Sequence, residues 1–144
     1  MKFTIDVVID QPREKVWEVF DNPDNMSKWQ PTVKRFELQS GKPGQPGSVS
    51  KLVYDENGRE VVLKETITSR NYPDEFSGTY EAPSTWNHLT NKFIPLGDKQ
   101  TKWVMEAEFR FDGLMKLFLP FMKGSLVKRT QEDMQRFKQL AESQ

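Results

Sequence analysis

The hydrophobic pattern of this chain changes at Asp112-Gly113, and that change limits the possible folds more than any other feature. Between Thr32 and Asp112, apolar-rich runs of strand length alternate with turn signals, whereas after Gly113 the apolar residues recur at helical spacing. The pattern predicts an α+β protein in which a curved antiparallel sheet is followed by a long C-terminal helix. The six strands of this region are expected near 33–40, 48–55, 59–70, 75–82, 85–95 and 100–112.

The residues before Thr32 predict one more strand and two short helices. Residues 3–9 alternate between apolar and polar side chains, which is the period of a half-buried strand. Pro12 suits the first turn of a helix, because the N–H that proline lacks has no partner there. Asn22-Pro23-Asp24 ends that helix, and a further short turn is expected to end near Trp29. The expected sheet therefore has seven strands, with two short helices after the first.

The C-terminal helix is expected to be amphipathic. Its apolar face is formed by Leu126, Thr130, Met134, Phe137 and Ala141. Charged residues, including Arg129 and Asp133, are expected mainly elsewhere on the helix. The first part, 114–122, is apolar nearly all round and is interrupted by Pro120, so we expect a kink or a looser section there.

Length and charge exclude several classes of protein. With 144 residues the chain is expected to form one domain, 1–144, that buries a core without disulfides or metal ions. The 21 Lys and Arg residues balance the 21 Asp and Glu residues, so no overall positive field exists to bind nucleic acid. The chain has no cysteine, no secretory signal pattern near Met1 and no uncharged apolar stretch long enough to cross a bilayer. A cytoplasmic protein without a transmembrane segment is expected.

No motif for a cofactor or a metal ion is present. The chain lacks a phosphate loop, a dinucleotide fingerprint and a GxSxG nucleophile elbow. His88 is the one histidine, and in the absence of cysteine a zinc site would need two or more carboxylates beside it. We therefore expect no cofactor and no metal.

The inner face of the predicted sheet would line any cavity between the sheet and the helix. Alternation places Trp103 and Met105 on the inner side of strand 100–112, and Phe76 and Tyr80 on the inner side of strand 75–82. Tyr54 is a further aromatic residue that either stacks on a flat ligand or fills the core.

Strand 85–95 has two possible phases. One phase turns Asn87 and Asn91 inward, and the other turns Trp86 and His88 inward. We favour the first phase, in which the two amides either orient a ligand carbonyl or hydroxyl, or bond to each other or to buried water. His88 would act as a general base only in the second phase, and otherwise lies on the outer face or at an edge.

Glu65 is the most informative acidic residue. It shares one face of strand 59–70 with Val61, Leu63 and Ile67. Burial there would raise its pKa and would suit it to general acid or base catalysis, or to anchoring a ligand. The alternative is structural, with Glu65 near the open end of the sheet or paired with an arginine or lysine.

Several motifs support a resemblance over essentially the whole chain. They are Pro12 to Trp17, the Asn22-Pro23-Asp24 to Trp29 elbow, Pro46-Gly47 before the third strand, Lys64-Glu65-Thr66, and the Phe93-Ile94-Pro95-Leu96-Gly97 turn. With this order of elements, the chain resembles the START-like superfamily, also called SRPBCC, and especially its polyketide-cyclase-like branch of small bacterial proteins. The resemblance implies a helix-grip fold with a deep cavity for a lipid, sterol, polyketide or other hydrophobic molecule. It also implies that some members catalyse cyclisation or dehydration, although one fold hosts many functions.

Three hypotheses for function follow. The first is a carrier, non-enzymatic or weakly catalytic, of a small hydrophobic ligand, acting as a monomer or weak homodimer. The second is a cyclase or dehydratase with a polyketide-like substrate, in which Glu65 is the catalytic candidate and the asparagines hold a developing enolate oxygen. The third is a protein-interaction module that uses segment 114–122. The residues expected to contact a ligand are Tyr54, Glu65, Phe76, Tyr80, Asn87, Asn91, Trp103, Met105, Phe118 and Met122.

Overall fold

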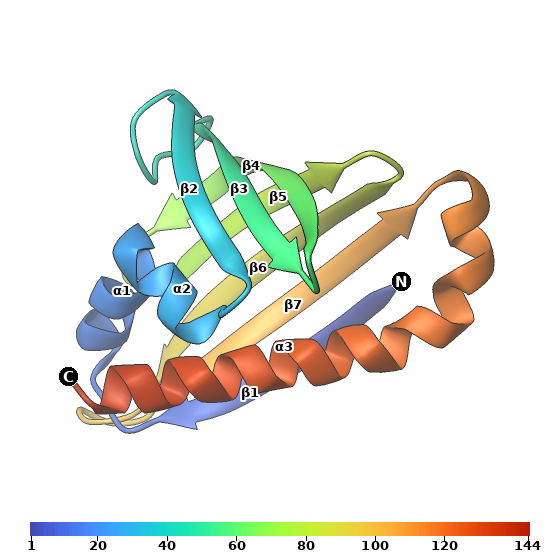
Figure 1. The fold of residues 1–144 in the computed structure, drawn as a ribbon. Helices are drawn as coiled ribbons and strands as arrows, with labels where there is room; N and C mark the ends of the chain where they lie inside the picture. The colour runs from blue at the N-terminus through green and yellow to red at the C-terminus, as the bar shows by residue number, and fades with distance from the viewer.

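Seven strands form one antiparallel sheet in the order β1-β7-β6-β5-β4-β3-β2 (Figure 1). The computed structural model describes residues 1–144. The strands are β1 (Lys2–Ile9), β2 (Val33–Ser40), β3 (Val49–Glu56), β4 (Arg59–Asn71), β5 (Glu75–Ala82), β6 (Thr85–Pro95) and β7 (Thr101–Phe111). The helices are α1 (Arg13–Asp21), the 3₁₀ helix η1 (Pro23–Asn25), α2 (Met26–Trp29), the 3₁₀ helix η2 (Gly113–Phe118) and α3 (Leu119–Glu142).

This architecture confirms the α+β fold expected from the sequence. Each strand begins and ends within one residue of its expected bounds, and two short helices follow β1. The turn between β3 and β4 consists of Asn57 and Gly58, which both adopt positive φ angles, of 56° and 84°. A two-residue hairpin turn of this hand needs positive φ at both positions, which asparagine and glycine tolerate best.

The sheet curves strongly, so that its concave face surrounds α3 (Figure 1). Irregularities in register occur between Val33 and Arg35 in the β2–β3 pair, and between Ile67 and Ser69 in the β4–β5 pair. Such bulges bend a strand and increase its twist. They help to turn the β2–β4 part of the sheet away from the plane of β1, β7 and β6.

Helix α3 packs against only part of the concave face. It lies mainly along β1 and α2, while its Phe137 ring meets Trp103 of β7 and its Arg129 pairs with Glu56 of β3. Met134, Phe137 and Ala141 of the expected apolar face are buried, whereas Leu126 and Thr130 are only half-buried. The N-terminal half of α3 therefore stands off from the sheet and leaves space beneath it.

Of the two alternatives expected for 114–122, a looser section is present and a kink within α3 at Pro120 is not. Segment 113–118 is instead a separate 3₁₀ helix, and α3 begins at Leu119 with Pro120 in its first turn. Proline is tolerated there because the first N–H groups of a helix have no intrahelical partner. Gly124 lies within α3 without interrupting it.

An aromatic cluster fills the end of the interior next to α1 and α2. The ring centroids of Trp103 and Phe137 are 4.8 Å apart, those of Trp29 and Phe137 are 5.3 Å apart, and those of Phe20 and Phe93 are 5.3 Å apart. Most of these pairs meet edge to face, which is a favoured arrangement for aromatic rings. The cluster holds α3, α2 and the sheet together and closes this end of the interior.

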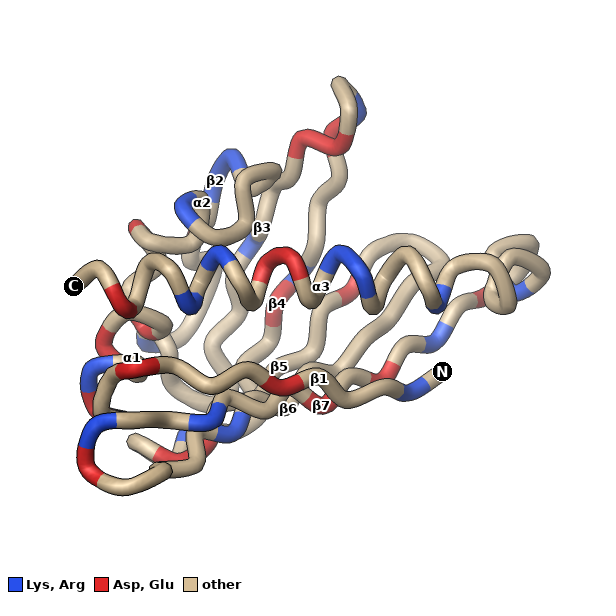
Figure 2. The backbone as a smooth tube through the Cα atoms, turned by 90° about the horizontal axis from the view of Figure 1, so that it is seen from below, with Lys and Arg blue, Asp and Glu red and all other residues tan.

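The surface shows no extended region of one charge. Figure 2 shows Lys and Arg positions interspersed with Asp and Glu positions along α3 and over the strands. None of the helices combines the length and the apolar character that a membrane span requires.

Candidate functional site: a cavity between the sheet and α3

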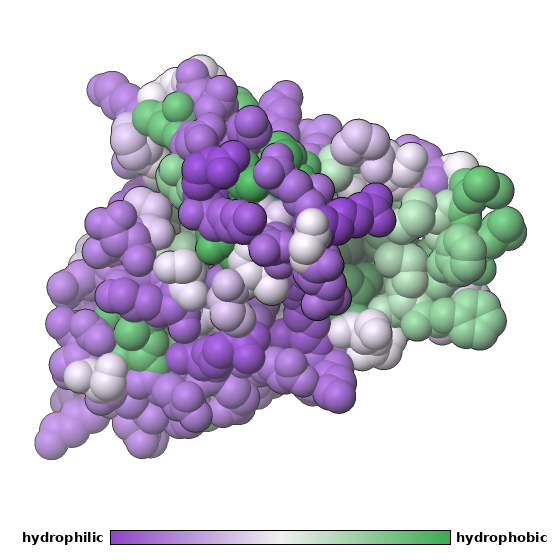
Figure 3. Space-filling model, in the orientation of Figure 1, coloured by the Kyte–Doolittle hydropathy of each residue, from purple (hydrophilic) through white to green (hydrophobic).

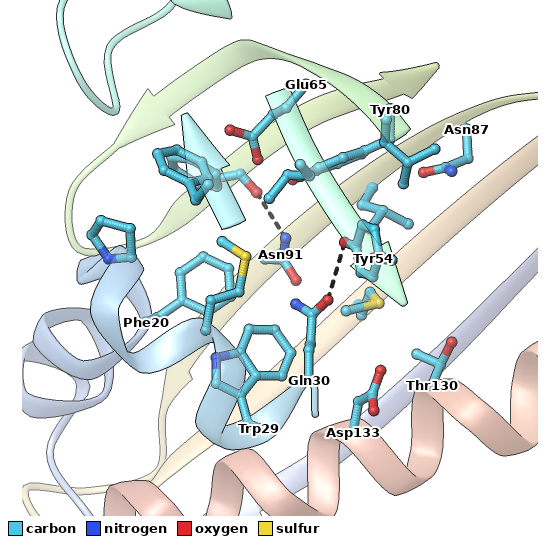
Figure 4. Close-up of a pocket in the computed structure, with 18 of the residues that line it drawn as sticks. Phe20, Trp29, Gln30, Tyr54, Glu65, Tyr80, Asn87, Asn91, Thr130 and Asp133 are labelled. Carbon is cyan, nitrogen blue, oxygen red and sulfur yellow. Dashed lines mark hydrogen bonds between the residues drawn. The ribbon is translucent and has the colours of Figure 1, made fainter. Parts of the chain in front are cut away.

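A cavity of about 660 Å³ lies between the concave face of the sheet and α3 (Figure 4). Strands β2 to β7 supply one wall, α3 supplies the other, and α1, η1 and α2 close one end. Of its 27 lining residues, 15 are hydrophobic. The wall therefore suits an apolar molecule and places polar groups at only a few positions.

The apolar wall comes from the inner positions of the strands. Its residues from the sheet are Phe36, Leu52, Val61, Leu63, Ile67, Phe76, Leu89, Met105 and Phe109, and α3 adds Leu126. Because side chains alternate along a strand, the sheet positions share the concave face. The fully buried aromatic rings lie at one end, so space is left between the middle of the sheet and the first half of α3.

Three polar side chains form a row across the middle of this wall. Glu65 of β4 lies directly opposite Tyr80 of β5, and Tyr80 lies directly opposite Asn87 of β6. All three line the cavity (Figure 4). Neighbouring strands are about 4.8 Å apart, so the row spans roughly 10 Å from Glu65 to Asn87.

Glu65 is buried without a positively charged partner. Its exposed fraction is 7 %, and none of the ion pairs in the structure involves it. Burial raises the pKa of the Glu65 carboxyl, and a hydrogen bond from the Tyr80 hydroxyl partly offsets this rise. The pairing of Glu65 with arginine or lysine, which was one structural alternative, is therefore not formed.

The two tyrosines near Glu65 are held in their neutral form. Burial, together with the nearby Glu65 carboxylate, raises the pKa of both Tyr80 and Tyr54. The Tyr54 hydroxyl also donates a hydrogen bond to Oε1 of Gln30, at 3.2 Å. Both hydroxyls therefore remain hydrogen-bond donors at any physiological pH.

The two inward-facing asparagines differ in their partners. Asn91 is satisfied at both ends of its amide, because Trp103 Nε1 donates to its Oδ1 at 3.0 Å and its Nδ2 donates to the Phe76 carbonyl at 3.4 Å. Asn87, by contrast, has a buried Oδ1 with no hydrogen-bond partner. Asn91 thus ties the wall to the aromatic cluster, while Asn87, which also lines the cavity, has an acceptor without a partner.

The other charged residues of the wall are paired. Asp21 accepts hydrogen bonds at both carboxylate oxygens from Arg70, at 2.7 and 2.9 Å. Arg129 of α3 pairs with Glu56 of β3 at 2.5 Å.

The third pair lies within α3, where Arg136 pairs with Asp133. Burial raises the pKa of the Asp133 carboxyl, and the interaction with Arg136 opposes that rise. Glu65 is therefore the one carboxylate of the wall that lacks a cation.

Three of the residues expected to contact a ligand do not line the cavity. Trp103 has no exposed surface and lies within the aromatic cluster. Phe118 lies in η2 and is 54 % exposed, and Met122 lies in the first turns of α3, outside the wall. The reason is that residues 113–118 form η2 and α3 begins only at Leu119. Segment 114–122 therefore does not cross the concave face as the start of one long helix would.

The remaining expected residues all lie on the wall. They are Tyr54, Glu65, Phe76, Tyr80, Asn87, Asn91 and Met105. His88 lies on the outer face, where its Nε2 is 3.2 Å from the Thr68 hydroxyl and its ring stacks on Trp86. Strand β6 therefore has the phase that turns Asn87 and Asn91 inward.

Two wall residues of α3 were expected on other faces. Arg129 and Asp133 both line the cavity. The signal for this was present, because they follow Leu126 by three and seven residues, and such positions share a helix face. Their charge concealed it, since charged side chains are usually assigned to the solvent side.

No group of three or more His, Asp or Glu side chains is arranged to hold a metal ion. The cavity wall also contains no histidine. The residues present offer hydroxyl, amide and carboxylate groups, which can hydrogen-bond an organic molecule.

A separate apolar patch lies outside the cavity. Leu114, Leu117, Phe118 and Phe121, of η2 and the start of α3, are between 54 % and 81 % exposed. In Figure 3 this patch is the cluster of hydrophobic side chains at the right-hand end, beyond the first turns of α3. Its position is set by the turn from η2 into α3.

A curved antiparallel sheet that grips a C-terminal helix around an apolar cavity defines the helix-grip proteins of the START-like superfamily. The sequence agrees, since residues 1–142 match the family described as "Polyketide cyclase / dehydrase and lipid transport". The chain belongs to this family, which confirms the resemblance noted from its motifs. A comparison with curated proteins gave no significant sequence match.

Solved structures share the fold at low sequence identity. The Zhui aromatase/cyclase from Streptomyces sp. R1128 superposes with a TM-score of 0.82 at 14 % identity, covering 99 % of this chain and 93 % of that one. A conserved protein from Geobacillus kaustophilus gives 0.80 at 13 % identity, covering 98 % and 95 %. Ara h 8.0201 gives 0.75 at 16 % identity, covering 100 % and 99 %. At such identities these similarities establish the fold alone.

Proposed function

We propose that the protein binds a small, largely apolar molecule in the cavity between the sheet and α3. The observation that carries this proposal is the cavity itself, which has a volume of about 660 Å³ and a mostly hydrophobic lining. Ligand sites in proteins typically occupy about 300–1,000 Å³ and combine an apolar lining with a few polar groups. The family match, which includes lipid transport in its description, supports the same reading.

The seven wall residues expected from the sequence would contact the ligand from the sheet side of the cavity. Phe76 and Met105 offer apolar surface, and Tyr54 and Tyr80 offer rings with a hydroxyl at the tip. Glu65, Asn87 and Tyr80 are placed to fix the orientation of a polar group. We expect the protein to work as a monomer or a weak homodimer, which light scattering at several concentrations would establish.

The experiment is native mass spectrometry of the purified protein, followed by solvent extraction and identification of any small molecule that travels with it. A matched pair of variants sharpens the result. Leu89→Trp would fill the middle of the cavity, whereas Val62→Trp adds the same side chain on the outer face of β4. We expect Leu89→Trp to release the ligand and Val62→Trp to retain it. Equal retention by both variants, with circular dichroism showing both folded, would contradict the proposal.

We also propose a second function, that of a cyclase or dehydratase, because one observation favours it. Glu65 is a buried carboxyl with a raised pKa, it lies beside a tyrosine hydroxyl, and it faces the cavity. A carboxyl with a raised pKa is suited to act as a general acid or base. The Zhui aromatase/cyclase, which shares the fold, carries a cyclase activity in its name.

Glu65→Gln separates the two functions. If the protein is an enzyme, this substitution abolishes turnover of a polyketide-like substrate while binding survives, because glutamine keeps the shape of the side chain and loses its acid. If the protein is a carrier, no turnover is detected before or after the change, and the ligand is recovered unaltered.

A further inference from the structure

We infer that the ligand of this cavity carries a positively charged amine on its apolar body, and that the Glu65 carboxylate binds this amine. The inference rests on the proposed binding function and adds the chemical class of the ligand. Its basis is the distribution of charge over the cavity wall.

The wall is acidic overall. Its charged residues are four acids, Asp21, Glu56, Glu65 and Asp133, and one base, Arg129. An anionic head group, such as a carboxylate or a phosphate, would meet a like charge at Glu65 and would find no unpaired base on the wall. Such a juxtaposition disfavours a ligand strongly in a site of low dielectric constant.

Glu65 differs from the other three acids because its charge is not compensated. Asp21 is paired with Arg70, Glu56 with Arg129, and Asp133 with Arg136. No cation contacts Glu65, although only 7 % of its surface is exposed. A buried carboxylate without a counter-ion is costly, and a ligand that brings the counter-ion removes that cost on binding.

The groups around Glu65 suit an ammonium group better than any other head group. Tyr80 is directly opposite on the next strand, and Tyr54 is close enough for the charge on Glu65 to raise its pKa. Both rings line the cavity and can face a cation, which aromatic rings attract. The open acceptor Oδ1 of Asn87 ends the same row and would receive a second N–H or O–H group of the ligand.

The test uses three probes that share one apolar body and differ only in the head group: naphthylbutylamine, naphthylbutanol and naphthylbutyrate. Binding to the full chain is followed by isothermal titration calorimetry at neutral pH. A charge-assisted hydrogen bond is roughly twice as strong as a neutral one, so we expect the amine to bind at least about tenfold more tightly than the alcohol. The carboxylate is expected to bind more weakly than the alcohol by a similar factor.

The affinity for the alcohol and the ratio of the two affinities test different hypotheses. Binding of the alcohol tests the cavity as a site for apolar molecules, and the ratio of amine to alcohol affinity tests the inference. A ratio near one, or tighter binding of the carboxylate, would overturn the inference and leave the proposed function standing. Failure of all three probes to bind would overturn both.

A pair of glutamate variants locates the effect. Glu65→Gln should bring the amine-to-alcohol ratio close to one, because the charge is lost while the shape of the side chain is kept. Glu81→Gln makes the same substitution at an exposed position next to Tyr80 and should leave the ratio as it is. A ratio that survives Glu65→Gln would contradict the role assigned to this carboxylate.

Discussion

Replacing the two inward-facing asparagines of β6 with leucine should change stability in opposite directions. Asn87 and Asn91 lie four residues apart on the same face of one strand, so the two variants make the same chemical change in similar surroundings. They differ in hydrogen bonding. Asn91 accepts from the Trp103 indole and donates to the Phe76 carbonyl, whereas the buried Oδ1 of Asn87 has no partner.

The magnitudes follow from the groups that each variant leaves behind. Asn91→Leu leaves two buried groups without a partner, the Trp103 N–H and the Phe76 carbonyl, at about 1–2 kcal/mol each, so we expect a loss of about 2–4 kcal/mol. Asn87→Leu removes an acceptor that is already unsatisfied and adds apolar surface, so we expect a gain of about 1–2 kcal/mol.

Thermal unfolding followed by circular dichroism provides the assay. For 144 residues the unfolding entropy is about 0.3 kcal/mol per kelvin. The melting temperature should therefore fall by roughly 7–13 °C in Asn91→Leu and rise by roughly 3–7 °C in Asn87→Leu. Urea unfolding at one temperature checks both values. Similar losses in the two variants would refute the reasoning, because they would mean that Asn87 is as well partnered as Asn91.

Three further substitutions test other parts of the structure. Phe137→Ala, at the centre of the aromatic cluster, should lower stability by about 3–5 kcal/mol, whereas Phe121→Ala, at an 81 % exposed site in the same helix, should change it by less than about 0.5 kcal/mol; equal losses in urea unfolding would contradict the assignment of the core. Because burial raises the pKa of Glu65, the folded chain holds this proton more tightly than the unfolded chain does, so stability falls as the pH rises from the usual value of 4.5 through the raised value. Glu65→Gln should remove that fall and therefore stabilise the protein at alkaline pH but not below pH 4.5; a stability difference independent of pH would argue against burial of the charge. Arg129→Gln breaks a half-exposed pair with Glu56, which should cost at most about 1 kcal/mol in urea unfolding and speed the release of a bound probe in stopped-flow fluorescence; an unchanged release rate would show that this pair does not hold α3 against β3.

The strands and their inner faces were predictable because a strand has a simple period. Once the bounds of β4 were right, alternation placed Glu65 on the same face as its apolar neighbours, whereas for β6 it left two phases, of which the favoured one, with Asn91 inward, is observed. The hairpin at Asn57-Gly58 was predictable for a similar reason, since its backbone angles suit few other residue pairs. These features depend on local sequence alone.

The path of segment 113–122 was not predictable in the same way. A continuous apolar run does not indicate where a 3₁₀ helix ends and an α-helix begins. Pro120 is compatible with either a kink or a helix start. The choice between the two depends on how Met134 and Phe137 pack the other end of α3 against the aromatic cluster. For this reason Phe118 and Met122 were assigned to a wall that they do not reach.

The hydrogen-bond partners of the polar residues also could not be predicted from the sequence. These partners decide the roles of the polar residues. Asn87 and Asn91 are equivalent by position on β6, but only Asn91 meets the indole of Trp103. The pairings of Asp133 and Glu56 with arginines likewise depend on the distance between α3 and the sheet, which no local pattern contains. A sequence gives the face that a side chain occupies, whereas its partner depends on how separate elements pack.

The polar row on the concave wall is best understood as a cost to stability that a ligand offsets. An apolar residue at position 65 or 87 would pack against the neighbouring strands and would avoid a buried carboxyl and an open acceptor. The remainder of the interior shows that this chain can satisfy such groups, because Asn91 and Tyr54 both have partners. Unsatisfied groups in an otherwise consistent fold mark the places where packing alone does not determine the residue. Glu65 and Asn87 stand together in one row of the cavity wall, and a bound molecule with hydrogen-bond donors would complete both.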